Sequence, residues 1–373
     1  MTRLRLSDIG SLFHEKYFSL PLMWALEVLA SDKDVLQING KSVGHFVRTK
    51  NARSYFAALL KACVDGGFKL PSATPEQIKS VVEADEQFVS KVKGWLKPSE
   101  RKPGFSKKKN YSKQQRKIFE LLRKLFDYDS FVDGKGWKYS KKDKEIRSIN
   151  LGDQNITWRA FEFHRQIVGT NNLRYCPYCN AETVFLLSDI KSKSGESRSH
   201  LDHFYPRSAF PYLGVSLYNL VPVCAHCNSS MKGDKIPFEA KVFWPNPYAE
   251  DFNELARFRY IKDPCEVVLG GDNNKVNLEV VEGQNGCGAE LYAKEMNVVT
   301  KYNQAYGREI NELPHRLRLA MTISPSLAAD LLDNDDAQYE SRYMLNCSLD
   351  ERNIHAERLS KMTIDLVDQL VGE

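Results

Sequence analysis

The first hundred residues carry apolar positions at helical spacing. The clearest element begins at Thr74, where Thr74-Pro75-Glu76-Gln77 offers an N-cap, a proline at the first helical position and a capping-box glutamine. Apolar residues then recur three, four or seven positions apart, at Ile78, Val81, Phe88, Val92 and Trp95. This period predicts an amphipathic helix whose apolar stripe packs into a core.

A segment poor in apolar residues follows this helix. It contains Pro98, Pro103, Gly104 and the triplet Lys107, Lys108, Lys109, a composition that predicts a linker or an exposed loop. A short helix is expected at 115–126. Another helical pattern at 156–168 leads directly to the first paired cysteine, so we place a domain boundary near residue 151.

Further along the chain, short strand-like runs at 258–261, 266–269 and 276–281 predict a small accessory sheet. A long helix is expected from 292 to 313, and at least two more helices after it. The pattern therefore predicts an α+β protein in three parts. These are a helical N-terminal domain at 1–150, a central domain at 151–250, and a C-terminal domain at 251–373 that combines the small sheet with helices.

Length and composition agree with several domains. A chain of 373 residues with 42% hydrophobic residues can bury two or three cores. Its start lacks the apolar stretch and cleavage site of a secretory signal, and no segment is long enough to span a bilayer. Four cysteines stand far apart, as expected of reduced thiols in a cytoplasm: Cys63, Cys265, Cys287 and Cys347. We expect a cytoplasmic protein with no membrane partner.

The net charge of +5 is unevenly placed along the chain. From 97 to 147, 17 Lys and Arg against 7 Asp and Glu give a local charge of +10, which leaves −5 for the remainder. Such a stretch can neutralise phosphates of a nucleic acid, although basic segments are often solvated linkers with no partner.

Two Cys-x-x-Cys pairs, Cys176/Cys179 and Cys224/Cys227, carry the most specific chemistry. Each such turn presents two thiolates to one ion, and two turns complete the tetrahedral shell that zinc favours. The 44 residues between Cys179 and Cys224 exceed the spacing of a simple zinc ribbon, so a folded insert must lie between the pairs. We predict a structural zinc ion in this four-cysteine arrangement, here called the zinc knuckle; a redox pair or metal-free thiols are the alternatives.

The insert places polar residues between two expected strands, 199–204 and 217–223, joined by a turn-rich loop at 206–214. Asp202 and His203 end the first strand, and helix-compatible sequence follows Asn228. Neighbouring strand residues point to opposite faces, so Asp202 and His203 can serve one site only if the strand ends or twists at Tyr205-Pro206.

The motifs Asp202-His203, Asn219-Leu220 and Cys224-x-x-Cys227-Asn228, with Lys232 downstream, resemble the zinc-knuckle branch of the HNH endonucleases, which have the ββα-metal fold. The resemblance covers about 60 of 373 residues. It implies a catalytic divalent ion bound by Asp202 and by Asn228, which replaces the final histidine. It also implies His203 as general base and Asn219 as the residue that steadies the loop.

The resemblance therefore refines the expected fold to a central ββα-metal module with the four-cysteine zinc knuckle, flanked by mainly helical regions. An amide oxygen at Asn228 favours an oxygen-preferring ion such as Mg²⁺, or Mn²⁺, over a nitrogen-liganded one. Phosphodiester hydrolysis needs a base to deprotonate water, and a neutral histidine can do this near pH 7 while a hard cation offsets phosphate charge. The implied products are a 5′-phosphate and a 3′-hydroxyl.

Other nearby side chains are less specific. His200 shares a strand face with Asp202 and is either a site residue or a hydrogen-bonding residue of the sheet. His226 could reach a phosphate but is more simply an exposed side chain, and His164 is expected to be an ordinary surface or core residue. Candidate phosphate contacts, with solvated surface charge as the alternative for each, are Arg207, Lys232, Lys235, Lys107, Lys108 and Lys109.

A looser resemblance extends past the zinc knuckle. Asn246-Pro247-Tyr248, the run at 258–260 and the segment at 308–311 are similar to HNH subunits of Septu-type anti-phage defence systems. This implies a bacterial effector that works with an ATPase partner. The predicted function is a metal-dependent HNH endonuclease, with DNA favoured because the family mostly cuts DNA. The alternatives are an RNA- or tRNA-cleaving nuclease and an inactive, zinc-stabilised nucleic-acid-binding or adaptor protein.

Overall fold

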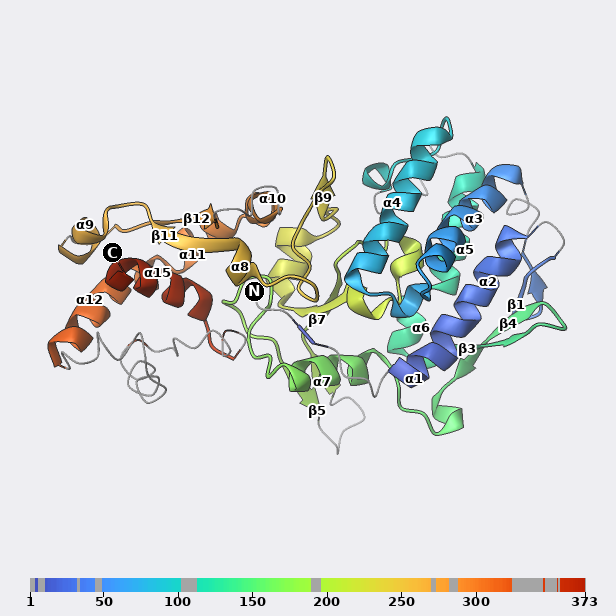
Figure 1. Cartoon of the computed structure of the whole chain (residues 1–373). Helices are drawn as coiled ribbons and strands as arrows, with labels where there is room; N and C mark the ends of the chain where they lie inside the picture. The colour runs from blue at the N-terminus through green and yellow to red at the C-terminus, as the bar shows by residue number, and fades with distance from the viewer. Residues whose placement is uncertain are drawn as a thin grey trace.

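The computed structural model describes most of the chain: residues 4–5, 11–31, 34–43, 49–101, 113–188, 196–269, 273–281, 288–323, 345, 354 and 356–372. The molecule is elongated, with the N-terminal helices at one end, the C-terminal elements at the other and β7 and α7 between them (Figure 1). Buried apolar side chains nevertheless form one continuous cluster that runs from Leu4 to Val367. The three predicted parts therefore share a core.

The N-terminal part is built on helices, as the apolar pattern predicts. Helix α4 confirms the predicted start, because Thr74 and Gln77 form the capping box. Val92 caps the end of α4, so Trp95 lies beyond the helix, although its side chain is buried. The helical elements are α1 Ser11–His14, η2 Glu15–Ser19, α2 Leu20–Ala30, α3 Lys50–Asp65, α4 Pro75–Lys91, α5 Lys113–Leu125 and α6 Tyr128–Val132.

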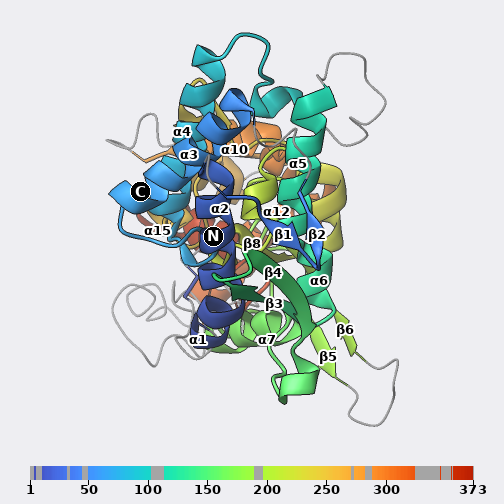
Figure 2. The same ribbon diagram turned by 90° about the vertical axis from the view of Figure 1, so that its right-hand side faces the viewer.

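A four-stranded sheet also lies in this part, which the sequence reading missed (Figure 2). Its strands are β1 Gln37–Ile38, β2 Lys41–Ser42, β3 Lys135–Ser140 and β4 Glu145–Asn150, in the order β2-β1-β4-β3. The helix predicted at 115–126 is confirmed as α5, whereas α6, β3 and β4 in the basic stretch 97–147 were not predicted. The strands were missed because their exposed positions carry charged residues, which made the segment read as a solvated stretch. Trp137 and Ile146 are buried, while Lys138 and Arg147 are exposed.

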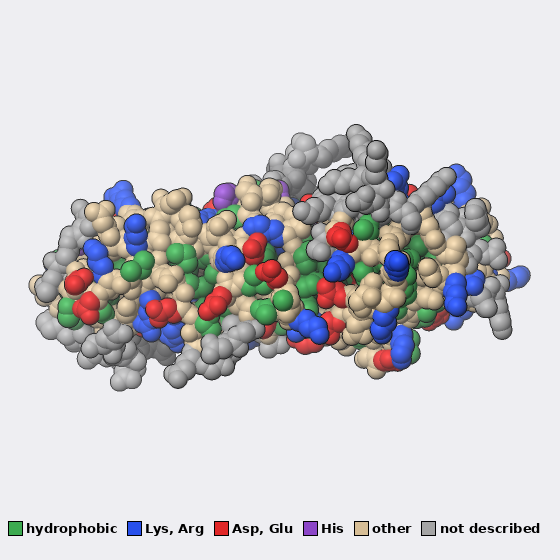
Figure 3. All heavy atoms as spheres, turned by 90° about the horizontal axis from the view of Figure 1, so that it is seen from above, with side chains coloured by type: hydrophobic (Ala, Val, Ile, Leu, Met, Phe, Trp, Pro, Cys, Tyr) green, Lys and Arg blue, Asp and Glu red, His purple; other side chains and the backbone are tan. Residues whose placement is uncertain are grey.

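The basic residues of this stretch are spread over several elements. On the face shown in Figure 3, Lys and Arg side chains are interspersed with Asp and Glu, and they are more frequent toward the N-terminal end. Lys107, Lys108 and Lys109 lie outside the described residues. The predicted phosphate contacts at these three positions stay predictions.

The central part consists of short elements around the paired cysteines. The expected strand at 199–204 is β7 His200–His203, and it pairs antiparallel with β8 Leu220–Val223, Asp202 opposite Val221. The second strand starts later than predicted because Leu217–Asn219 forms a 3-10 turn, η9. The remaining elements are α7 Ala160–Thr170, β5 Leu186–Ser188, β6 Glu196–Arg198, η8 Pro211–Leu213 and the π-helix η10 Cys227–Lys232.

The C-terminal part confirms two of its three predicted strands, β11 Ala256–Tyr260 and β12 Val276–Val280, which pair antiparallel. The strand predicted at 266–269 is wrong: Pro264–Leu269 is helix α9, and its first turn is capped by the side chain of Asp263. The other elements are β9 Phe238–Glu239, β10 Val242–Phe243, α8 Phe252–Leu255, α10 Ala289–Glu295, α11 Val298–Ala305, α12 Gly307–Ile323 and α15 Ser360–Gly372.

The long helix expected at 292–313 is divided into α10, α11 and α12. Asn297 adopts a left-handed conformation with φ of 47°, and the chain turns again at Tyr306. The apolar stripe continues across both breaks, so periodicity alone could not detect them. Of the closing helices, α15 packs against β11, where Asp365 and Gln369 accept the backbone N–H groups of Phe258 and Tyr260. No helix among the described residues combines the length and apolarity needed to cross a bilayer.

Candidate metal centre and catalytic site

The four paired cysteines come together as a buried cluster. Their Sγ atoms all lie within 4.8 Å of one another. Hydrogen bonding to the other three thiols holds the pKa of Cys179 below its usual value, whereas burial raises the pKa of Cys176. Four converging sulfurs form a donor set that suits zinc, and the cluster could hold such a metal.

Tyrosines of the C-terminal helices hold the first cysteine turn in place. The Tyr292 hydroxyl on α10 donates to the carbonyl of Tyr178 (2.5 Å), and the Tyr302 hydroxyl on α11 donates to that of Cys179 (2.6 Å). Both tyrosines are buried. The cluster is thus the point where the C-terminal part meets the central part, a connection that the sequence reading missed.

Strand β7 and helix η10 lie beside each other and run in the same direction. Near their starts, the Asn228 amide nitrogen lies 2.7 Å from Nδ1 of His200. Near their ends, Lys232 Nζ donates to Asp202 (3.2 Å) and to the carbonyl of His203 (2.7 Å). Asn228 and Lys232 are four residues apart and lie on the same face of this helix, and π-helical turns are frequent at functional sites.

Asp202 is held in a buried ion pair. Oδ1 of Asp202 accepts the hydrogen bond from Lys232 described above. Oδ2 accepts a hydrogen bond from the Tyr178 hydroxyl (2.7 Å) and also lies 3.1 Å from Lys232 Nζ. The Lys232 and Asp202 side chains are 1% and 5% exposed. Lys232 is therefore not the surface phosphate contact that the sequence suggested, because its ammonium is enclosed and faces Asp202.

His203 is fixed by its backbone surroundings and by one aromatic neighbour. Its Nε2–H donates to the carbonyl of Gly214 (2.9 Å), and the Tyr128 ring packs edge-on at a centroid distance of 4.8 Å. Burial lowers the pKa of the imidazole from 6.5 to about 4, so the ring is neutral at pH 7. Within the described part of the chain, Nδ1 has no hydrogen-bond partner. A neutral ring with Nε2 protonated leaves Nδ1 able to accept a proton.

Asn219 joins the two ends of the loop that follows β7. Its side-chain oxygen accepts from the N–H of Tyr205 (2.7 Å), and its amide donates to the carbonyls of Tyr205 and Leu213 (3.1 Å each). Asn219 is fully buried. The loop it closes contains Gly214, whose carbonyl orients His203.

Asp202 and Asn228 do not form a ready site for a divalent ion as they are placed. The carboxylate of Asp202 is engaged by Lys232 and Tyr178, whereas Asn228 contacts His200 through its amide nitrogen and not through the oxygen that would bind a cation. No hydrogen bond joins Asp202 to Asn228 in the described structure. A cation bound by both residues would have to displace Lys232 from Asp202.

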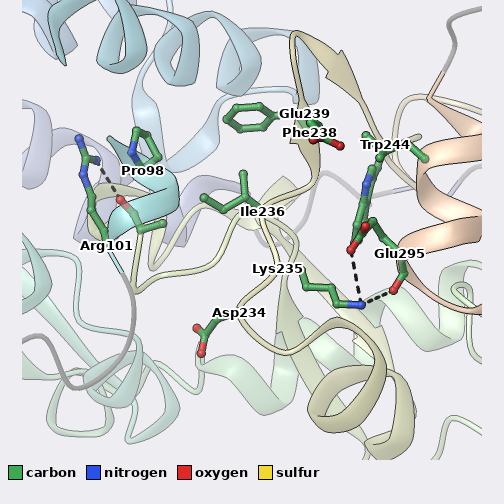
Figure 4. A pocket seen from close by; sticks show the side chains of 11 residues that line it. Pro98, Arg101, Asp234, Lys235, Ile236, Phe238, Glu239, Trp244 and Glu295 are labelled. Carbon is green, nitrogen blue, oxygen red and sulfur yellow. Dashed lines mark hydrogen bonds and ion pairs between the residues drawn. The ribbon is translucent and has the colours of Figure 1, made fainter. Parts of the chain in front are cut away.

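The remaining candidate residues lie around this centre. Arg207 is half exposed and pairs with Asp129 at 3.1 Å. Lys235 lines a cavity of about 780 Å³ and points to Glu295, which it contacts through both the carboxylate and the backbone carbonyl (Figure 4). His226 is exposed. His164 is a core residue, and burial lowers its pKa to about 3.

The geometry therefore contains a buried four-thiol cluster, an adjacent Asp-Lys ion pair and a neutral histidine with one free ring nitrogen. These groups can supply a metal-stabilised scaffold and a base. In comparisons with protein-family models, curated proteins and solved structures, nothing matches this chain.

Proposed function

We propose that the protein is an HNH-type endonuclease that hydrolyses phosphodiester bonds, with DNA as its preferred substrate. The observation that carries the proposal is the state of His203. A backbone carbonyl fixes its Nε2–H, burial keeps the ring neutral, and Nδ1 remains available at the end of a strand beside the zinc knuckle. A general base must be neutral and must have a ring nitrogen able to accept a proton, and His203 has both properties at pH 7.

The proposed reaction uses these side chains directly. Nδ1 of His203 takes a proton from a water molecule whose oxygen forms the new bond to phosphorus. The bond between phosphorus and the 3′ oxygen breaks, which leaves a 5′-phosphate and a 3′-hydroxyl, the products that the HNH resemblance implies. The Gly214 carbonyl stabilises the imidazolium that forms, because it accepts the remaining N–H.

Two metals belong to the proposal. Structural zinc at Cys176, Cys179, Cys224 and Cys227 would hold the module together, and the buried thiol cluster supports it. A catalytic Mg²⁺ or Mn²⁺ is implied by the resemblance, with Asp202 and Asn228 as the oxygen donors. Since Lys232 and Tyr178 engage the carboxylate of Asp202, we assign the divalent ion no step.

A role in bacterial anti-phage defence with an ATPase partner is a further part of the proposal, and it rests on the looser resemblance. Within the fold, Tyr248 of the motif Asn246-Pro247-Tyr248 donates its hydroxyl to the carbonyl of Leu220 in β8 (2.6 Å). The motif thus packs directly against the strand that pairs with β7. A substitution of Tyr248 should therefore shift β8 and, through it, the strand that carries the proposed site.

The test compares wild type with His203→Ala on plasmid DNA and on total RNA, with Mg²⁺, Mn²⁺ and EDTA arms. His203→Ala should abolish cleavage, whereas His315→Ala, an exposed histidine on α12, should not. Preferred cutting of RNA would favour the RNA- or tRNA-cleaving alternative. Binding without cleavage by the wild type under every condition would refute the nuclease and favour the adaptor.

A further inference from the structure

A second cavity, smaller than the one in Figure 4, shares Asp234 with it. It has a volume of about 470 Å³, and its lining includes Arg123, Tyr128 and Arg207. Tyr128 is also the residue whose ring packs against His203 at 4.8 Å. One aromatic ring therefore separates the cavity from the proposed base.

Two arginines contact Tyr128, and a third lines the same cavity beside one of them. The Arg207 guanidinium, in the loop after β7, lies 5.8 Å from the centre of the Tyr128 ring. Arg198, at the end of β6, donates to the Tyr128 hydroxyl (3.3 Å). Arg123, on α5, donates to the carbonyl of Ser208, the neighbour of Arg207 (3.3 Å).

This convergence contributes little to the fold. Arg123 is exposed and Arg207 is half exposed, so neither guanidinium gains from burial. Arg123 and Arg207 both line the cavity, and the planar guanidinium group is suited to hold a phosphate by paired hydrogen bonds.

Three aspartates line the same cavity, and each already has a partner. Asp127 caps α6 by accepting the N–H groups of Asp129 and Ser130. Asp234 accepts the hydroxyl of Ser208 (2.8 Å). Asp129 pairs with Arg207, but the two side chains are 73% and 50% exposed, and such pairs contribute about 1 kcal/mol or less. A phosphate can therefore displace Asp129 from Arg207.

We infer that this cavity, here called the arginine subsite, binds a backbone phosphate of the nucleic acid next to the scissile bond, with Arg123 and Arg207 as its main contacts. The inference rests on the proposed function, because it assigns the subsite to the substrate of His203. The sequence suggested Arg207 as a phosphate contact, whereas the roles of Arg123, Arg198 and Tyr128 follow only from the fold.

The test measures binding without cleavage. A fluorescein-labelled DNA oligonucleotide is titrated by anisotropy, at salt concentrations from about 50 to 200 mM, with protein that carries His203→Ala. Arg123→Ala and Arg207→Ala should each weaken binding about tenfold and lower the slope of log K against log salt by about one. Lys124→Ala is the matched control, because Lys124 is the exposed neighbour of Arg123 and does not line the cavity. It should change binding less than about twofold.

The outcomes separate the inference from the proposed function. If both arginine variants bind with the affinity and salt slope of Lys124→Ala, the subsite is wrong even if the wild type cleaves DNA. If they bind weakly while the wild type cleaves nothing, the subsite stands as a binding surface and the nuclease fails. Equal competition by unlabelled poly-glutamate and unlabelled DNA would overturn the assignment to a phosphate. Unchanged thermal melting confirms that each variant is folded.

Discussion

Replacing Lys232 with methionine removes the ammonium that faces the buried carboxylate of Asp202. Methionine fills a similar volume, so the main change is electrostatic. Asp202 keeps one hydrogen bond from Tyr178, and the carbonyl of His203 loses its donor. Because the pair is only 1% and 5% exposed, water cannot easily replace the lost partner.

The expected cost is large for a single substitution. Removing one partner of a buried ion pair destabilises a protein by about 3–5 kcal/mol, because the remaining charge stays desolvated. In urea, with a slope of about 3 kcal/mol per molar, this cost moves the unfolding midpoint down by about 1–1.7 M. Adding Asp202→Asn removes the unpaired charge, so the double variant should recover about 2–3 kcal/mol of that loss.

Urea unfolding of zinc-loaded protein, followed by circular dichroism, measures these differences. Lys235→Met is the control, because Lys235 lies three residues away and its ion pair with Glu295 has both side chains 37% exposed. That variant should lose less than about 1 kcal/mol. The reasoning is refuted if Lys232→Met is as mild as the control, or if adding Asp202→Asn makes it less stable still.

Three other perturbations have defined outcomes. Cys227→Ser should abolish stoichiometric zinc in elemental analysis and the cooperative melting of the central part, and a mutant that melts like wild type without metal would contradict this. Gly214→Ala should lower stability and slow cleavage. A Cβ at this position would lie 2.3 Å from the carbonyl oxygen of Phe126, so the backbone must move and shift the Gly214 carbonyl that orients His203. An unchanged urea midpoint and cleavage rate would contradict this prediction. Burial lowers the pKa of His14 to about 3, so the unfolded state binds its proton first and stability falls as pH drops below about 6.5. Between pH 7 and 5 the loss from this group is about 2 kcal/mol, and His14→Phe should lose correspondingly less.

Features of the fold that depend on neighbouring residues could be predicted from the sequence. The capping box at Thr74 needs only four consecutive residues, and the structure contains it. The cysteine cluster follows from spacing, because a Cys-x-x-Cys turn can bring its two thiols together whatever surrounds it. The strand β7 ends at His203, as the following Tyr205-Pro206 step suggested.

Features that depend on distant segments could not be predicted. The sheet of β1 and β2 with β3 and β4 pairs residues about a hundred positions apart, and β1 and β2 are two residues long, too short to show a period. The ring of Tyr128, at the start of α6, and the carbonyl of Gly214, in the loop after β7, reach His203 from different segments. Gly214 lies in the turn-rich loop at 206–214, but the sequence did not indicate that its carbonyl would contact His203. The ion pair of Lys232 with Asp202 joins residues 30 positions apart, so no local pattern indicates it.

The arrangement around Asp202 connects both cysteine turns to the proposed base. Tyr178 lies inside the first turn and donates to Asp202, while Lys232 ends the helix that begins in the second turn and contacts both Asp202 and the carbonyl of His203. The position of Asp202 therefore depends on the relative placement of the two turns, and a metal bound by all four thiols would fix that placement. This explains why the thiol cluster and the strand with the proposed base lie in one stretch of 57 residues, 176–232: the thiols would set the geometry of the ion pair, and the ion pair contacts the backbone that carries His203.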